Sequence, residues 1–149
     1  MGRYFEEIEV GMRLQHAYQK TITEGEHHLF CAMTLNPQPL HISEAFAKDT
    51  QFGQRLVNGL YTLSLVVGIT VNDLTFGTIV ANLGYESVVH PHPVFHNDTI
   101  RVETEVLSKR DSRSKPDRGI VRLKHLGYNQ HDDIVCEVIR AVMFLKKPE

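Results

Sequence analysis

Hydrophobic and polar positions follow different periods in the two parts of this 149-residue chain. After Gly77 the apolar residues tend to alternate with polar ones, which is typical of strands with one buried face. The clearest case is residues 99–109, where Ile100, Val102, Thr104 and Val106 share one side and charged residues share the other. Before Gly77 most of the pattern favours helices. We therefore expect a sheet that is built largely from the second part of the chain.

Five strands are predicted, and short turn-like segments separate the last three. These turns are residues 111–118, a charged hairpin loop, and residues 129–133. Short connections favour antiparallel pairing, because parallel neighbours need long crossovers. The predicted strands are residues 13–21, 78–87, 99–109, 119–128 and 134–145.

The helices are predicted mainly from their start signals. Thr23 and Glu26 form a capping box, so a helix should follow with His27, Phe30 and Cys31 on one face. Residues 36–42 contain two prolines and are expected to be a rigid loop. Ser43 directly follows this loop and can cap a short helix that should extend to residue 48.

The most apolar segment, residues 60–72, is predicted to be a helix that covers the apolar face of the sheet. Its apolar residues lie on nearly every side, which indicates burial. Its many β-branched residues would also suit a strand, but the length favours a helix. The prediction is one α+β domain over residues 1–149.

Composition and charge exclude several classes of protein. The formal net charge of −2 and dispersed basic residues give no basis for nucleic-acid binding. No apolar run is long enough to span a membrane, and residues 1–7 do not resemble a signal peptide. Cys31 and Cys136 are too far apart in sequence to indicate a disulfide framework or a zinc ribbon. A cytoplasmic protein is therefore expected.

The stretch of residues 34–41 carries the strongest chemical signal. It is stiffened by two prolines and ends at His41, so it can hold an imidazole in one place. Histidine is the side chain best suited to proton transfer near neutral pH. The structural alternative for His41 is a histidine that only bonds a loop carbonyl. For Asn36 the alternative is an Asx-type turn residue.

Three segments together resemble the MaoC-type enoyl-CoA hydratase branch of the hot-dog fold. They are Leu-Asn-Pro-Gln-Pro-Leu-His at 35–41, Val-Asn-Gly-Leu at 57–60 and Pro-Val-Phe-His-Asn-Asp-Thr-Ile at 93–100. Residues 57–63, 68–73 and 112–119 further resemble a bacterial subgroup that includes itaconyl-CoA and mesaconyl-CoA hydratases. The resemblance implies a long helix wrapped by a curved antiparallel sheet.

The resemblance also implies a reaction and a set of roles. Water adds to a 2-enoyl thioester, or leaves a 3-hydroxyacyl one, with His41 as the base and the Gly59 amide facing the thioester oxygen. The family's aspartate is replaced by Asn36, which cannot take a proton from water. Gln38 and Asn58 fall at further motif positions and are expected to contact substrate. No cofactor is implied apart from the coenzyme A of the substrate.

Basic residues supply candidate contacts for the charged parts of an acyl-CoA. Arg113 and Arg118, in the predicted hairpin loop, are candidates for the phosphates of coenzyme A. Arg55, just before the central helix, is a candidate for a free carboxylate on the acyl group. His90, His92 and His96 should share one side of an extended stretch. Their spacing is unlike that of a metal site, so no metal is expected.

Two other functions stay open, together with the oligomeric state. A hot-dog thioesterase would hydrolyse the thioester, for which Asp73 is a poor candidate carboxylate. A catalytically inactive acyl-CoA-binding protein would fit the loss of the aspartate. The resemblance implies a homodimer, or a larger homo-oligomer, formed by pairing sheets edge to edge.

Overall fold

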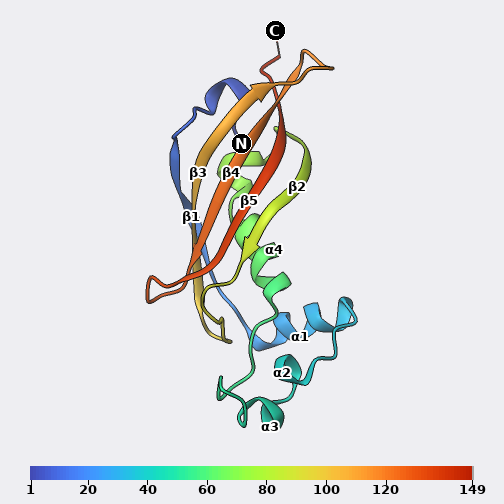
Figure 1. The fold of residues 1–149 in the computed structure, drawn as a ribbon, viewed down its shortest axis with the longest axis vertical. Helices are drawn as coiled ribbons and strands as arrows, with labels where there is room; N and C mark the ends of the chain where they lie inside the picture. The colour runs from blue at the N-terminus through green and yellow to red at the C-terminus, as the bar shows by residue number, and fades with distance from the viewer. Residues whose placement is uncertain (149) are drawn as a thin grey trace.

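The computed structural model describes residues 1–148 and shows a curved antiparallel sheet around a helix (Figure 1). The strands lie in the order β1-β3-β4-β5-β2, and every neighbouring pair is antiparallel. Each predicted strand is confirmed, with bounds that differ by at most two residues. The strands are β1 (Arg13–Thr21), β2 (Ile79–Val89), β3 (Thr99–Asp111), β4 (Arg118–Tyr128) and β5 (Ile134–Leu145).

The three predicted helices begin where the sequence indicates, but the central one ends at Ile69 and not near residue 72, and a further helix forms where a loop was expected. The capping box is confirmed, because the Thr23 hydroxyl accepts from the Glu26 amide at the start of α1. Residues 36–42 are not entirely loop, since Pro39 opens a one-turn helix, a position that proline favours. The described helices are η1 (Phe5–Glu7), α1 (Glu24–Met33), α2 (Pro39–Ile42), α3 (Glu44–Ala47), α4 (Gly59–Ile69) and the π-helical turn η2 (Val71–Thr75).

Helix α4 lies against the inner face of the sheet but is not covered on all sides. Thr62, Val66 and Ile69 are buried, and a methyl group on Gly127 of β4 would lie only 2.6 Å from Val66 Cγ2. Leu60, by contrast, is 60% exposed. The prediction of burial all round is therefore wrong for a single chain, because the sheet reaches only one side of the helix. No helix within residues 1–148 is long and apolar enough to cross a membrane.

A chain of buried polar side chains crosses the inner face of the sheet from β5 to β1. Arg140 Nε donates to His125 Nε2 over 2.8 Å, and His125 Nδ1 lies 2.7 Å from the Thr104 hydroxyl. That hydroxyl lies 2.6 Å from His16 Nε2, and His16 Nδ1 lies 2.5 Å from Asp73 in η2. The four groups on strands are at most 8% exposed. We call this set the polar chain.

The direction of each hydrogen bond in the polar chain follows from its first member. A guanidinium can only donate, so His125 Nε2 accepts. Burial, and then the charge of Arg140, lowers the pKa of His125 well below its ordinary value, so the ring is neutral and Nδ1 donates to Thr104. The Thr104 proton then points to His16, and His16 donates to the Asp73 carboxylate. The polar chain thus links a buried cation to a carboxylate.

We predict that His125→Leu lowers the free energy of unfolding by about 3–5 kcal/mol, since it leaves the Arg140 charge buried without its acceptor. The double variant His125→Leu/Arg140→Leu should recover much of this loss, because no buried charge is then left unpaired. Urea unfolding of the wild type and both variants measures the difference. Equal stability of the single and double variants would contradict this account.

Candidate functional site

Residues 56–59 join the helices to the sheet at the lower end of the molecule in Figure 1. The amide of Leu56 donates to the Leu40 carbonyl over 3.1 Å, and Leu56 also forms an isolated β-bridge with Phe95. The amide of Val57 donates to the Val94 carbonyl over 2.8 Å. This segment leads directly into α4, so its backbone fixes where that helix begins.

His41, in α2, is held by this segment in one tautomer. Its Nδ1 lies 2.7 Å from the carbonyl oxygen of Leu56, which can only accept. Nδ1 therefore carries the proton, and Nε2 of the neutral ring keeps its lone pair. The ring is partly buried and lies edge-on to His27, with 5.9 Å between ring centroids. This arrangement provides a positioned proton acceptor.

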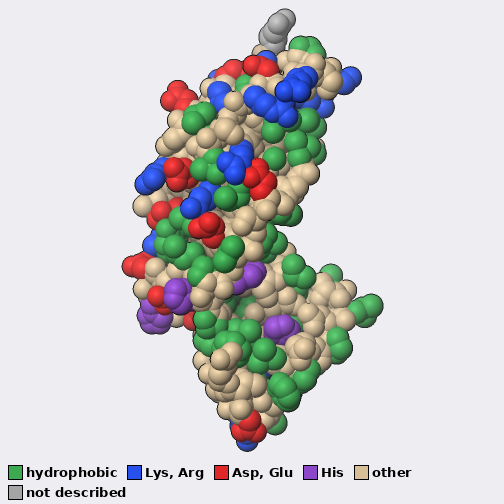
Figure 2. Space-filling model, viewed as in Figure 1, with side chains coloured by type: hydrophobic (Ala, Val, Ile, Leu, Met, Phe, Trp, Pro, Cys, Tyr) green, Lys and Arg blue, Asp and Glu red, His purple; other side chains and the backbone are tan. Residues whose placement is uncertain are grey.

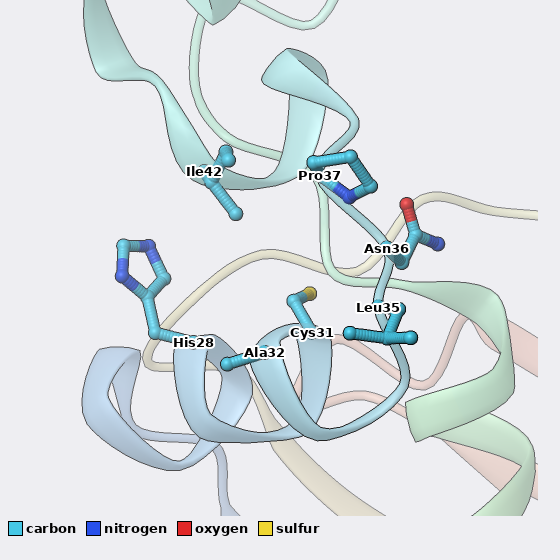
Figure 3. Close-up of a pocket in the computed structure, with 7 residues that line it drawn as sticks. All are labelled: His28, Cys31, Ala32, Leu35, Asn36, Pro37 and Ile42. Atoms are coloured by element: carbon cyan, nitrogen blue, oxygen red, sulfur yellow. The ribbon is translucent and has the colours of Figure 1, made fainter.

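The loop before His41 borders a groove of about 700 Å³ between α1 and α2 (Figure 3). Asn36 lies at one end of the groove and His28 at the other, with the Cys31 side chain between them. The Asn36 Oδ1 atom accepts from the Gln38 amide over 3.2 Å, which is an Asx turn. The turn leaves the amide nitrogen of Asn36 for other partners. Gln38 itself is exposed.

His27 is a buried connection between α1 and the start of α4, and its importance was not recognised from the sequence. Its Nε2 accepts from the Asn58 amide over 2.9 Å, and its Nδ1 lies 2.8 Å from His96 Nε2. Burial, reinforced by His96, His41, His28 and Arg55, lowers the pKa of His27 to about 4. The ring is therefore neutral at pH 7. The ring is fully buried.

Arg55 is engaged within the protein in this structure. Its Nε and Nη1 atoms each lie 2.7 Å from a carboxylate oxygen, of Glu44 and Glu24 respectively. Nη1 also donates to His28 over 3.0 Å. The side chain is 14% exposed and ties α1 to α3. Its expected contact with a substrate carboxylate would require these bonds to be exchanged.

Gly59 begins α4 beside a second cavity of about 410 Å³, which His90 and His92 also line. None of the hydrogen bonds of residues 1–148 uses the Gly59 amide, because the Asn58 side chain caps the amide of Leu60 instead. Within residues 1–148 the Asn58 Nδ2 atom is buried and has no hydrogen-bond partner. The start of α4 therefore offers free donors, at the positive end of the helix dipole.

The three histidines of residues 90–96 do not share one side, contrary to the prediction. His90 and His92 bond the carbonyls of Val135 and Ile134, whereas His96 bonds His27 on α1. The bridge that Leu56 forms with Phe95 separates the two groups. Across the described chain, no cluster of three or more His, Cys, Asp or Glu side chains is arranged to hold a metal ion.

Arg113 and Arg118 lie far from His41 within one chain. The loop that joins β3 to β4 is at the upper end of the sheet, opposite α1 to α3 (Figure 1). Arg118 pairs with Asp117 over 2.7 Å, and Arg113 is exposed. Lys and Arg side chains gather at this end of the molecule (Figure 2).

Comparisons with known proteins agree with the architecture. The family model described as "MaoC like domain" matches residues 6–129. A mesaconyl-CoA hydratase from Cereibacter sphaeroides is 34% identical over 146 residues, which are 98% of this chain and 42% of that protein. A MaoC domain dehydratase structure from Chloroflexus aurantiacus superposes with a TM-score of 0.92 at 31% identity, covering 99% of this chain and 41% of that one.

The fold is further supported by a structure from Mycobacterium tuberculosis that is described as a double hot-dog fold. It has a TM-score of 0.88 at 22% identity and covers 99% of this chain and 46% of that one. The predicted hot-dog architecture is thus confirmed. The chain spans about two fifths of the length of the Cereibacter and Chloroflexus proteins.

We predict that the free energy of unfolding falls as the pH is lowered from about 6.5 to about 4, the interval between the ordinary and the native pKa of His27. The unfolded state binds a proton there that the native state does not, at about 1.4 kcal/mol per pH unit for one group. Urea unfolding at several pH values should show a shallower slope in His27→Gln, which keeps a donor and an acceptor. Identical slopes in the two proteins would rule out this assignment.

Proposed function

Because the chain belongs to the MaoC-like dehydratase family, we propose that it adds water to the double bond of a 2-enoyl-CoA, or catalyses the reverse dehydration. The carrying observation is the fixed tautomer of His41, whose Nδ1 bonds the Leu56 carbonyl in the segment that leads into α4. The mesaconyl-CoA hydratase among its relatives supports an itaconyl- or mesaconyl-type substrate.

In the proposed reaction His41 Nε2 removes a proton from water as the oxygen attacks the β-carbon. The Leu56 carbonyl, which accepts from Nδ1, also favours the imidazolium that forms. Such a positioned base contributes about 10²–10⁴-fold to a rate. Asn36 orients the water through its amide nitrogen, since its Oδ1 atom is used by the Asx turn. Gln38, at the same turn, contacts substrate at the mouth of the groove.

Negative charge on the thioester oxygen is stabilised by the amide of Gly59, with Asn58 as a neighbouring donor. The Gly59 amide is free, and the helix dipole adds positive potential at this point. The absence of a side chain at Gly59 makes room for the His90 ring, because a methyl group built there would lie 3.0 Å from His90 Nε2. In this proposal Arg55 binds an acyl carboxylate only after releasing Glu24 or Glu44.

A homodimer completes the proposed enzyme. β2 is an edge strand, and its large apolar side chains are exposed, as is Leu60 of α4. Antiparallel pairing of β2 with a second copy would cover this edge. It would also turn the second copy end for end, so that its Arg113 and Arg118 approach the coenzyme A phosphates at the other copy's site. Cys31 and Cys136 are free and buried, which supports the expected cytoplasmic location.

The hydratase prediction is that purified protein adds one water to an enoyl-CoA with the thioester intact. We expect His41→Ala to lower kcat by about 10²–10⁴-fold. The panel is crotonyl-, itaconyl- and mesaconyl-CoA, with mass spectrometry as the readout. Release of free coenzyme A would instead indicate a thioesterase. Binding without turnover, with activity gained in Asn36→Asp, would indicate a binding protein with a lost active site.

The dimer prediction is that Leu83→Glu, in the middle of β2, converts the protein to a monomer, because the edge then carries a charge into the interface. Analytical ultracentrifugation measures the mass. Leu29→Glu, at a leucine of α1 that is 60% exposed, is the matched control and should leave the dimer intact. A monomeric wild type, or a dimeric Leu83→Glu, would contradict this interface.

A further inference from the structure

The cavity beside Gly59 contains an imidazole to which the roles above assign no chemistry. Its lining includes two histidines and Thr62, and no Asp, Glu, Lys or Arg. His92 is the only other titratable side chain in that lining. The remaining lining residues are apolar: Phe52, Leu56, Val57, Pro91, Pro93, Val94 and Val135.

The His90 ring is oriented toward Gly59. Its Nδ1 lies 3.3 Å from the Val135 carbonyl, which can only accept, so Nδ1 carries a proton. Its Nε2 is the atom closest to Gly59: a methyl group built on that glycine would lie 3.0 Å from it. The nitrogen that gains and loses a proton therefore lies next to the start of α4. The ring is exposed at its other side, which allows proton exchange with solvent.

Hydration transfers two protons, and the motif residues supply one titratable side chain for both transfers. After water attacks the β-carbon, a proton must be delivered to the α-carbon. Asn36 has no proton that it can transfer near neutral pH, so without a second imidazole His41 would have to serve both carbons. The α-carbon is bonded to the carbonyl carbon whose oxygen would accept from the Gly59 amide. A side chain packed against Gly59 is therefore close to the α-carbon.

We propose that His90 is a second catalytic residue, the general acid that protonates the α-carbon of the enoyl thioester; this rests on the proposed hydratase function. The loop of residues 90–94 and the start of α4 line one cavity. The neighbouring His92 bonds the Ile134 carbonyl and holds the loop in place.

The water oxygen bonds to the β-carbon, and its proton passes to His41 Nε2. The π electrons of the double bond move toward the thioester oxygen, where the Gly59 amide stabilises the enolate. The enolate then takes the proton from His90 Nε2 at the α-carbon, and the carbonyl re-forms. Both imidazoles return to their starting states by proton exchange with solvent, and in dehydration neutral His90 removes the α-proton.

The test compares two His90 variants with wild type on an enoyl-CoA that the wild type hydrates. His90→Gln is polar without being titratable, and His90→Phe fills the space of the ring. Both should lower kcat by about 10²-fold with KM changed only a few-fold. In wild type kcat should fall at alkaline pH as the acid loses its proton, and this limb should be missing in both variants. His131→Gln, at an exposed turn histidine, is the control and should match wild type.

A second readout is the exchange of the α-proton of the 3-hydroxyacyl-CoA product with D₂O, followed by mass spectrometry. We expect exchange in wild type and its loss in both His90 variants. Wild-type kcat in the variants, or a lower kcat with an unchanged alkaline limb, would overturn the role of His90 while leaving the hydratase function intact. A wild type that turns over no enoyl-CoA would overturn both, so the two failures are distinguishable.

Discussion

The backbone of residues 56–59 is the constraint on which the candidate site depends. The Leu56 carbonyl accepts from the His41 ring, and the Leu56 amide donates to the Leu40 carbonyl. The next residues bond the loop after β2 and the buried ring of His27. These bonds come from three separate parts of the chain, so a shift of this segment would move the base, the helix start and the cavity together.

The histidines of this protein have different roles because their ring nitrogens form hydrogen bonds with different partners. His125 accepts from an arginine and His27 accepts from a backbone amide, so burial and these donors keep both neutral. In His41 and His90 the Nδ1 atom bonds a backbone carbonyl, and Nε2 forms no hydrogen bond within residues 1–148. The residue type alone does not distinguish a structural imidazole from a reactive one. The surroundings of the other ring nitrogen decide it, since His92 makes the same Nδ1 bond to a carbonyl and yet only holds its loop.

The strands could be predicted from the sequence because an alternating pattern is a local property of the chain. The position of His41 at the end of a stiff loop was also readable, since proline acts on its immediate neighbours. Its tautomer was not, because the carbonyl that sets it belongs to Leu56, fifteen positions away in sequence. The site role of His90 was missed because its three-histidine stretch was judged by spacing alone. The exposed side of α4 was missed because the pattern of one chain does not say what covers it.

The polar chain also has a consequence for how the strands align. Its members stand on β1, β3, β4 and β5, and each donates or accepts in only one direction. A slip of one residue in any of these strands would turn its member to the outer face and leave Arg140 buried without a route to Asp73. The line of polar groups therefore acts as a check on strand register, because a slip leaves a buried charge without its hydrogen-bond partners.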